Sequence, residues 1–287
     1  MPLLKLAFLG TGGAVPRGDR MLPAIYLEDW LGHRVLLDAG EGCQYRLLRF
    51  GVSPASLRVV AVTHGHEDHV LGLPGLVVTS RFLGGRLEVL APKSMHEVLS
   101  RLGVSVSDRL ETERLKIRCV EVCHTVDACG WFFEWDVGYR LDLQKAAGLP
   151  KWALTDLIRG RLVEVGGRVV TPEEVADPSH KRFRRLLYTG DTAPCPEMWR
   201  EVGEVDVLIH EATFADDVDI EKAHADGHST VADAVEAARA MKATVLVLTH
   251  ISARYRDKSR HRQLAAAVSP PPYVYIPEDF DTLLVKF

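Results

Sequence analysis

The sequence predicts an α/β protein in which two mixed β-sheets pack face to face and helices cover their outer faces. Short segments rich in β-branched residues alternate with helical patterns through both halves of the chain. Such alternation is typical of layered α/β architectures. No internal repeat and no low-complexity linker divides the chain, so we expect a single domain spanning residues 1–287.

The first predicted elements lead toward a cluster of metal-ligand side chains. Residues 3–9 form a predicted strand, and residues 24–29 and 33–37 form a predicted hairpin. Asp38 follows the hairpin. There it could cap the helix that runs toward Phe50, or it could support the metal-binding loop described next. Both roles are structural.

Residues 63–69, with the sequence THGHEDH, hold the densest set of metal-ligand side chains in the chain. They follow a predicted buried strand and precede a predicted helix at residues 71–82. In an extended loop, positions 64, 66 and 68 share one side and position 69 is offset, so the loop could serve two neighbouring metals. His64 and His66 would bind one ion, and Asp68 and His69 the other. Imidazole and carboxylate ligands suit Zn²⁺, Mn²⁺, Fe²⁺ or Co²⁺. The alternative is a polar surface loop that is rich in histidine.

The later predicted strands bring more ligand residues toward the same edge of the sheets. These strands are residues 87–90, 115–122, 131–135, 186–189, 205–209 and 245–248, with predicted helices at residues 94–102 and 227–240. Counting the strand before the histidine loop, five strands are followed by a His or Asp: His64, His124, Asp191, His210 and His250. Because α/β sheets place their ligands at the carboxyl ends of strands, this repeated placement indicates one site.

Residues 140–170 interrupt the alternation of strands and helices. We expect them to form a projecting arm inserted between two sheet strands rather than a second domain. Two basic segments, residues 181–185 and 254–262, are candidates for phosphate contacts, although each could be a solvated face. The formal charge of −4 argues against a chain coated in nucleic-acid-binding charge and leaves room for such local patches.

The composition predicts a soluble, cytoplasmic protein that does not enter a membrane. No apolar run approaches the roughly 18 residues of a membrane span, and the N-terminus lacks a signal-peptide pattern. The five cysteines include no C-x-x-C pair, so we expect buried thiols rather than a disulfide framework. The sequence contains no asparagine and more arginine than lysine, a weak indication of a thermophilic source.

Residues 63–77, THGHEDHVLGLPGLV, resemble the signature of the ribonuclease Z family, the tRNA 3′-end endonucleases of the metallo-β-lactamase superfamily. The similarity continues, in the family's order, through the segments Gly190-Asp191-Thr192, His210-Glu211-Ala212-Thr213, Gly227-His228-Ser229-Thr230 and the stretch at residues 248–255. The resemblance implies the metallo-β-lactamase fold, an αββα sandwich.

The resemblance also implies a set of roles for particular side chains. One metal would be held by His64, His66 and His124; the other by Asp68, His69 and His250; and Asp191 would bridge the two. The ions would be two divalent metals, zinc above all. Asp68 would also orient the attacking water, and Glu211 with His228 would give a proton to the leaving ribose oxygen. The implied partners are precursor tRNA and a second copy of the chain in a homodimer, with no membrane.

Two departures from the family pattern leave parts of this expectation open. The arm has Gly148-Leu149-Pro150 where the family has a Gly-Pro-rich motif, so its mode of gripping tRNA is open. Residues 16–21 replace a loop that affects the handling of a mature CCA end. Two other functions are also open: a small-molecule or cyclic-nucleotide phosphodiesterase on the same fold, and a non-catalytic RNA-binding module. The second is disfavoured because all seven ligand positions are filled.

Overall fold

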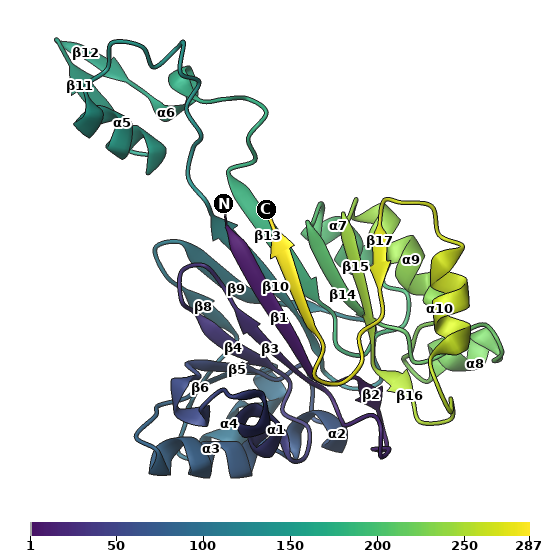
Figure 1. Ribbon diagram of the computed structural model, residues 1–287. Coiled ribbons are helices and arrows are strands. Elements are labelled where there is room, and N and C mark those ends of the chain that lie inside the picture. The colour runs from purple at the N-terminus through teal and green to yellow at the C-terminus, as the bar shows by residue number, and fades with distance from the viewer. Residues whose placement is uncertain (1) are drawn as a thin grey trace.

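Two seven-stranded sheets face each other at the centre of the computed structural model, which describes residues 2–287 (Figure 1). The strands of the first sheet, in spatial order, are β18 (Thr282–Lys286), β1 (Leu3–Gly10), β3 (Ala24–Glu28), β4 (Arg34–Leu37), β5 (Val59–Ala61), β6 (Glu88–Leu90) and β7 (Ser105–Ser107). Pairing is antiparallel from β18 to β4 and parallel from β4 to β7.

The second sheet has the same mixed character. In spatial order its strands are β17 (Tyr273–Tyr275), β15 (Val245–Thr249), β14 (Val207–Glu211), β13 (Phe183–Tyr188), β10 (Cys129–Asp136), β9 (Leu115–Glu121) and β8 (Arg109–Glu111). Strands β17 to β13 run parallel, and β13 to β8 run antiparallel. The predicted sandwich of two mixed sheets is confirmed.

Helices cover both outer faces of the sandwich. On the first sheet they are α1 (Cys43–Phe50), α2 (Glu67–Val70), α3 (Leu73–Phe82) and α4 (His96–Ser100). On the second they are α7 (Pro196–Val202), α9 (Val231–Ala240) and α10 (Ser259–Ala266), with α8 (Ile220–Ala225) beside them (Figure 1). No helix among residues 2–287 is long and apolar enough to cross a bilayer.

Strand β10 shows how the sequence specifies the two packed faces. Trp131, Phe133 and Trp135 point into the apolar layer between the sheets, whereas Phe132 packs under the helices of the second sheet. Side chains alternate between the faces of a strand, and both faces are buried here. This explains why residues 131–133 form a continuous apolar run rather than an alternating one.

Two short strands connect the amino-terminal loop to the loop after β15. Strand β2 (Gly12–Gly13) pairs in parallel with β16 (Ile251–Ser252). A side chain at Gly13 would collide with the imidazole of His250, so the close approach requires glycine. The pairing therefore places the start of the chain against the carboxyl end of β15.

The segment between β10 and β13 projects away from the sandwich (Figure 1). It contains α5 (Lys151–Ile158), the hairpin of β11 (Val163–Val165) and β12 (Arg168–Val170), and α6 (Pro172–Val175). Its apolar side chains form a cluster of their own that includes Ala153, Leu157 and Val175. A bridge between Leu141 and Ala176 closes its base, so the projection continues beyond residue 170.

The expectation that the cysteines are thiols is wrong for four of the five. Cys119 is disulfide-bonded to Cys129, and Cys123 to Cys195, whereas Cys43 is a free, buried thiol. The first pair forms because adjacent strands β9 and β10 bring its Cα atoms to 5.0 Å. The second joins residues 72 positions apart, a pairing that no local spacing can reveal.

Candidate metal centre

Seven side chains that follow the ends of four strands meet at one site. They form two neighbouring groups in which the potential ligand atoms lie within 4.8 Å of one another: His64, His66, His124 and Asp191 in the first, and Asp68, His69 and His250 in the second. The loop after β5 and helix α2 supply four of them, and the ends of β9, β13 and β15 supply the others. The structure thus brings together every residue that the sequence assigned as a ligand.

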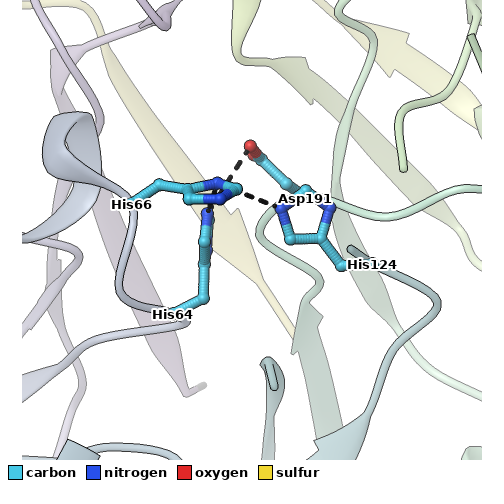
Figure 2. Close-up of side chains that lie close together, drawn as sticks. All are labelled: His64, His66, His124 and Asp191. Carbon is cyan, nitrogen blue, oxygen red and sulfur yellow. Dashed lines mark hydrogen bonds and ion pairs between the residues drawn. The ribbon is translucent and has the colours of Figure 1, made fainter. Parts of the chain in front are cut away.

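The first group is compact, with three imidazoles facing a carboxylate (Figure 2). His66 Nδ1 lies 2.9 Å from His64 Nε2 and 3.2 Å from His124 Nε2. Asp191 Oδ2 lies 3.8 Å from His64 Nε2. His64 and Asp191 are buried, whereas His66 and His124 retain partial exposure, so this group lies at the solvent-facing side.

Asp191 also contacts the second group through its other oxygen. Its Oδ1 atom lies 3.4 Å from His69 Nε2 and 3.2 Å from His250 Nε2. These two nitrogens are 3.2 Å apart, and Asp68 Oδ2 lies 3.3 Å from His250 Nε2. Asp191 therefore borders both groups, one with each carboxylate oxygen.

The outer nitrogens of His69, His124 and His250 are held by the surrounding protein. His69 Nδ1 lies 2.7 Å from Asp38 Oδ2, His124 Nδ1 lies 2.9 Å from the Gly227 carbonyl oxygen, and His250 Nδ1 lies 2.9 Å from Thr213 Oγ1. Such partners fix the tautomer and direct Nε2 toward a metal.

Charge and burial favour the ligand forms of His64 and Asp191. Burial and the neighbouring imidazoles lower the pKa of His64 to about 2, so this ring is neutral and can bind a metal. Burial alone would raise the pKa of Asp191, but His250, His69 and His64 hold it well below its ordinary value. Asp191 Oδ1 is buried and receives no hydrogen bond from the described residues. A neutral imidazole at His64 and a buried carboxylate oxygen without a hydrogen-bond donor are groups that can bind a divalent metal ion.

Glu211 and His228 form a pair beside the metal-ligand groups. Glu211 Oε1 lies 3.0 Å from His228 Nδ1, and the buried carboxylate also accepts hydrogen bonds from the backbone N–H groups of Thr192 and Thr213. Burial alone would lower the pKa of His228, but the hydrogen bond and charge of Glu211 raise it to about 9. His228 Nδ1 lies 3.9 Å from Asp191 Oδ2, so a protonated imidazole borders the centre.

Two supporting residues complete the site. Asp38 contacts His69 rather than capping α1, whose N-cap is Gly42, so the second of its two predicted roles is confirmed. Tyr188, the last residue of β13, donates its hydroxyl to Asp38 across 2.7 Å. Tyr188 carries no sequence signal of this role, because a tyrosine on the inward face of a strand is typical of ordinary core. His210 donates Nδ1–H to the carbonyl oxygen of Glu211 and belongs to neither metal-ligand group, so the strand-end expectation is wrong for this one of the five residues.

Comparison with known proteins agrees with the fold. The family described as the Beta-lactamase superfamily domain matches residues 33–251. Ribonuclease Z of Pyrobaculum calidifontis is 79% identical over 286 residues, 100% of each chain, and that of Sulfurisphaera tokodaii is 34% identical over 89% of this chain and 90% of the relative. The crystal structure of human tRNase Z, short form, shares the fold with a TM-score of 0.65 and 23% identity, over 97% of this chain and 98% of that one.

The sandwich and its histidine–aspartate cluster define a member of the metallo-β-lactamase superfamily. Within that superfamily, the chain belongs to the ribonuclease Z family.

Proposed function

We propose that this chain is a metal-dependent endoribonuclease that removes the 3′ trailer from precursor tRNA and leaves a 3′-hydroxyl on the tRNA. The observation that carries the proposal is the Glu211–His228 pair beside the ligand cluster. A ribose 3′-oxygen is a poor leaving group that needs a proton, and a positioned imidazolium can supply one. The names of the relatives support the same reaction.

We assign the metal ligands according to the two geometric groups. One ion would be held by His64, His66 and His124, the other by Asp68, His69 and His250, with Asp191 shared. Two divalent ions would lower the pKa of the attacking water and neutralise charge on the phosphate. Zinc suits this imidazole-rich set best, and Mn²⁺, Fe²⁺ or Co²⁺ also accept it.

The protein's own residues then divide the remaining work. Asp68 orients the attacking water, and the backbone N–H of Ala14, 2.7 Å from Asp68 Oδ2, holds the carboxylate in place. His228 donates the proton to the leaving oxygen. Glu211 fixes the tautomer of His228 and stabilises its charged form.

The projecting arm is the part of the chain best suited to hold RNA away from the cut. Lys145, Lys151 and Arg159 are exposed on it, and none forms an ion pair with a carboxylate among residues 2–287. The basic segment 181–185 is less available than the sequence suggests. Arg182 and Arg185 pair with Asp136 and Glu134, at 2.7 and 2.8 Å. The arm's own cations therefore carry the proposed phosphate contacts.

Two observations support a homodimer in which one subunit's arm serves the other subunit's centre. The arm joins the amino end of β13 (Figure 1). Asp191 follows the carboxyl end of that strand, so the arm and this ligand residue lie at opposite ends of β13. Helices α1 and α3 also expose large apolar side chains, among them Tyr45 at 70% and Phe82 at 87%. A second copy would cover this face.

We propose that the chain is organised as one catalytic domain with an inserted arm. We also propose that it is located in the cytoplasm, where precursor tRNA is processed. The competing function is a phosphodiesterase for small or cyclic nucleotides, which would need no arm. A non-catalytic RNA-binding module is disfavoured by the intact ligand set.

Incubation of metal-loaded protein with a 3′-extended precursor tRNA, followed by mapping of both RNA ends, tests the proposal. We expect one cut near the 3′ end of the tRNA body and a 3′-hydroxyl on the tRNA fragment. Hydrolysis of bis(p-nitrophenyl) phosphate without any cut in the RNA would favour the small-substrate phosphodiesterase.

A further inference from the structure

We propose that the two disulfides are positioning elements for one half of the metal centre. They constrain the loop that carries His124 and connect it to the segment that carries Asp191. Their reduction weakens metal binding by His64, His66 and His124 and leaves the group of Asp68, His69 and His250 in place. The inference rests on the metal assignment made under the proposed function.

The first disulfide closes the base of the His124 loop. Strands β9 and β10 are antiparallel, and Cys119 and Cys129 lie on facing strands with a sequence separation of 10. His124 lies inside this closed segment. The bond therefore limits how far the two strands can separate at the end that presents the ligand.

The second disulfide fixes the tip of the same loop. Cys123 directly precedes His124, and its partner Cys195 lies four residues after Asp191. Two hydrogen bonds connect the same segments: Cys123 N–H to Thr192 Oγ1 at 3.1 Å, and Ala193 N–H to the Cys123 carbonyl oxygen at 2.8 Å. The covalent bond holds in register two ligand segments that would otherwise depend on these contacts.

The group of Asp68, His69 and His250 does not depend on a disulfide for its position. His69 and His250 are buried, and they are held by the side chains of Asp38 and Thr213. His124 is partly exposed, and the carbonyl oxygen of Gly227 is the partner of its outer nitrogen. A freed loop must lose conformational entropy each time it binds a metal, and a closed loop loses less.

Cys123 is the accessible sulfur of the Cys123–Cys195 disulfide, because Cys195 is buried and Cys123 is partly exposed. A water-soluble phosphine attacks one sulfur and breaks the S–S bond. Water then hydrolyses the sulfur–phosphorus bond to give phosphine oxide, and both cysteines remain on the chain as thiols. The disulfide gains two electrons and two protons, and the phosphine is oxidised.

The test compares oxidised and phosphine-reduced protein after the phosphine has been removed. Thiol titration of the denatured protein should rise from one to five, because four of the five cysteines are paired. Zinc-loaded protein is then challenged with 4-(2-pyridylazo)resorcinol. We expect the oxidised form to keep two ions under conditions in which the reduced form keeps one, with the affinity of the lost ion reduced about 10- to 100-fold, as for loss of other ligand-supporting groups.

Matched variants locate the effect. Cys123→Ser with Cys195→Ser should reproduce most of the loss, because this disulfide connects two ligand segments. Cys119→Ser with Cys129→Ser should reproduce a smaller part, because that disulfide lies within one segment. Far-UV circular dichroism checks that each form is folded. If a variant fails to fold, the reduced natural protein supplies the comparison.

Several results would overturn the inference. Five titratable thiols in the untreated protein would show that the disulfides do not form. Equal retention of both ions, or equal loss of both, by folded reduced protein would show that they do not position one half selectively. An oxidised protein that binds fewer than two ions would overturn the dinuclear assignment as well. Two bound ions without RNA cleavage would overturn the proposed function alone.

Discussion

Glu211 Oε1 lies 3.0 Å from His228 Nδ1, although the two residues are 17 positions apart in the chain. The carboxylate is fully buried, and the imidazole side chain keeps 21% of its surface exposed. One partner therefore lies in the protein interior and the other reaches the region where an RNA strand would bind. This arrangement suits a proton donor held in a fixed orientation.

The first prediction separates proton donation from metal binding. His228→Ala should keep both metals and near-normal precursor-tRNA affinity while cleavage falls about 10²- to 10⁴-fold, the usual cost of losing a positioned proton donor. Glu211→Ala should lose somewhat less, and the double variant little more than His228→Ala, because the pair acts as a unit. Single-turnover cleavage and elemental analysis measure both quantities.

Hydrolysis of a p-nitrophenyl ester is the control, since its leaving group needs no proton. It should suffer much less than RNA cleavage in His228→Ala. His228 also lies near Asp191 and His250 in a group that could hold a metal. Loss of a metal in His228→Ala would make this residue a ligand instead of the acid.

The second prediction concerns pH. The folded-state pKa of His228 is about 9, above its ordinary value of 6.5. The pair's contribution to stability should be complete below pH 6.5 and disappear as the pH rises through about 9. Thermal unfolding of metal-free protein between about pH 6.5 and 9 measures this contribution to stability. Glu211→Gln should flatten the slope, and an unchanged slope would show that the pair does not titrate as described.

The third prediction is the metal stoichiometry. Metal-replete protein should contain about two ions per chain. Asp191→Ala should weaken both sites, because Asp191 borders both groups, whereas His250→Ala should mainly empty one. Elemental analysis after dialysis gives the counts. A natural protein that stays near one ion despite added metal would contradict the dinuclear centre.

The fourth prediction tests Tyr188 through a variant that keeps its ring. Tyr188→Phe removes the hydroxyl that donates to Asp38, which in turn contacts His69. The affinity of the ion bound by His69 should fall by up to about 10-fold, the lower end for such supporting groups. The ion bound by His124 serves as the internal control. Equal weakening of both ions would indicate a general loss of packing.

The fifth prediction concerns the arm. Replacing residues 140–177 by a short Gly-Ser linker should weaken precursor-tRNA binding and spare hydrolysis of bis(p-nitrophenyl) phosphate. The arm has its own apolar cluster, so its removal should leave the sandwich core intact. Binding and hydrolysis assays on the same preparation make the comparison. Equal loss of both activities would identify the arm as an element needed for folding.

A charge variant refines that test. Changing Lys145, Lys151 and Arg159 to alanine should reduce the steepness of the salt dependence of binding by up to about three counterions, because each phosphate contact releases roughly one. The matched control changes Arg182 and Arg185, which are already paired with carboxylates. This control should alter the salt dependence much less.

The sequence by itself determined the sandwich and named the seven side chains that cluster in the structure. Strand and helix patterns are local, so residues 59–62 could be predicted as the strand that becomes β5 without any knowledge of its neighbours. The histidine loop follows that strand directly, and His124, Asp191 and His250 follow other strands in the same way. Their convergence could be predicted because carboxyl ends of strands in α/β sheets form the binding edge.

Only the tertiary structure decided which distant residues meet. Cys123 pairs with Cys195, Tyr188 supports Asp38, and Arg182 is neutralised by Asp136, yet each partner lies far away in the sequence. These contacts depend on the register and packing of strands that local patterns do not specify. No local sequence signal therefore distinguishes Tyr188, Cys123 or the basic segment 181–185 from similar residues elsewhere. Their roles follow from the partners that the fold places beside them.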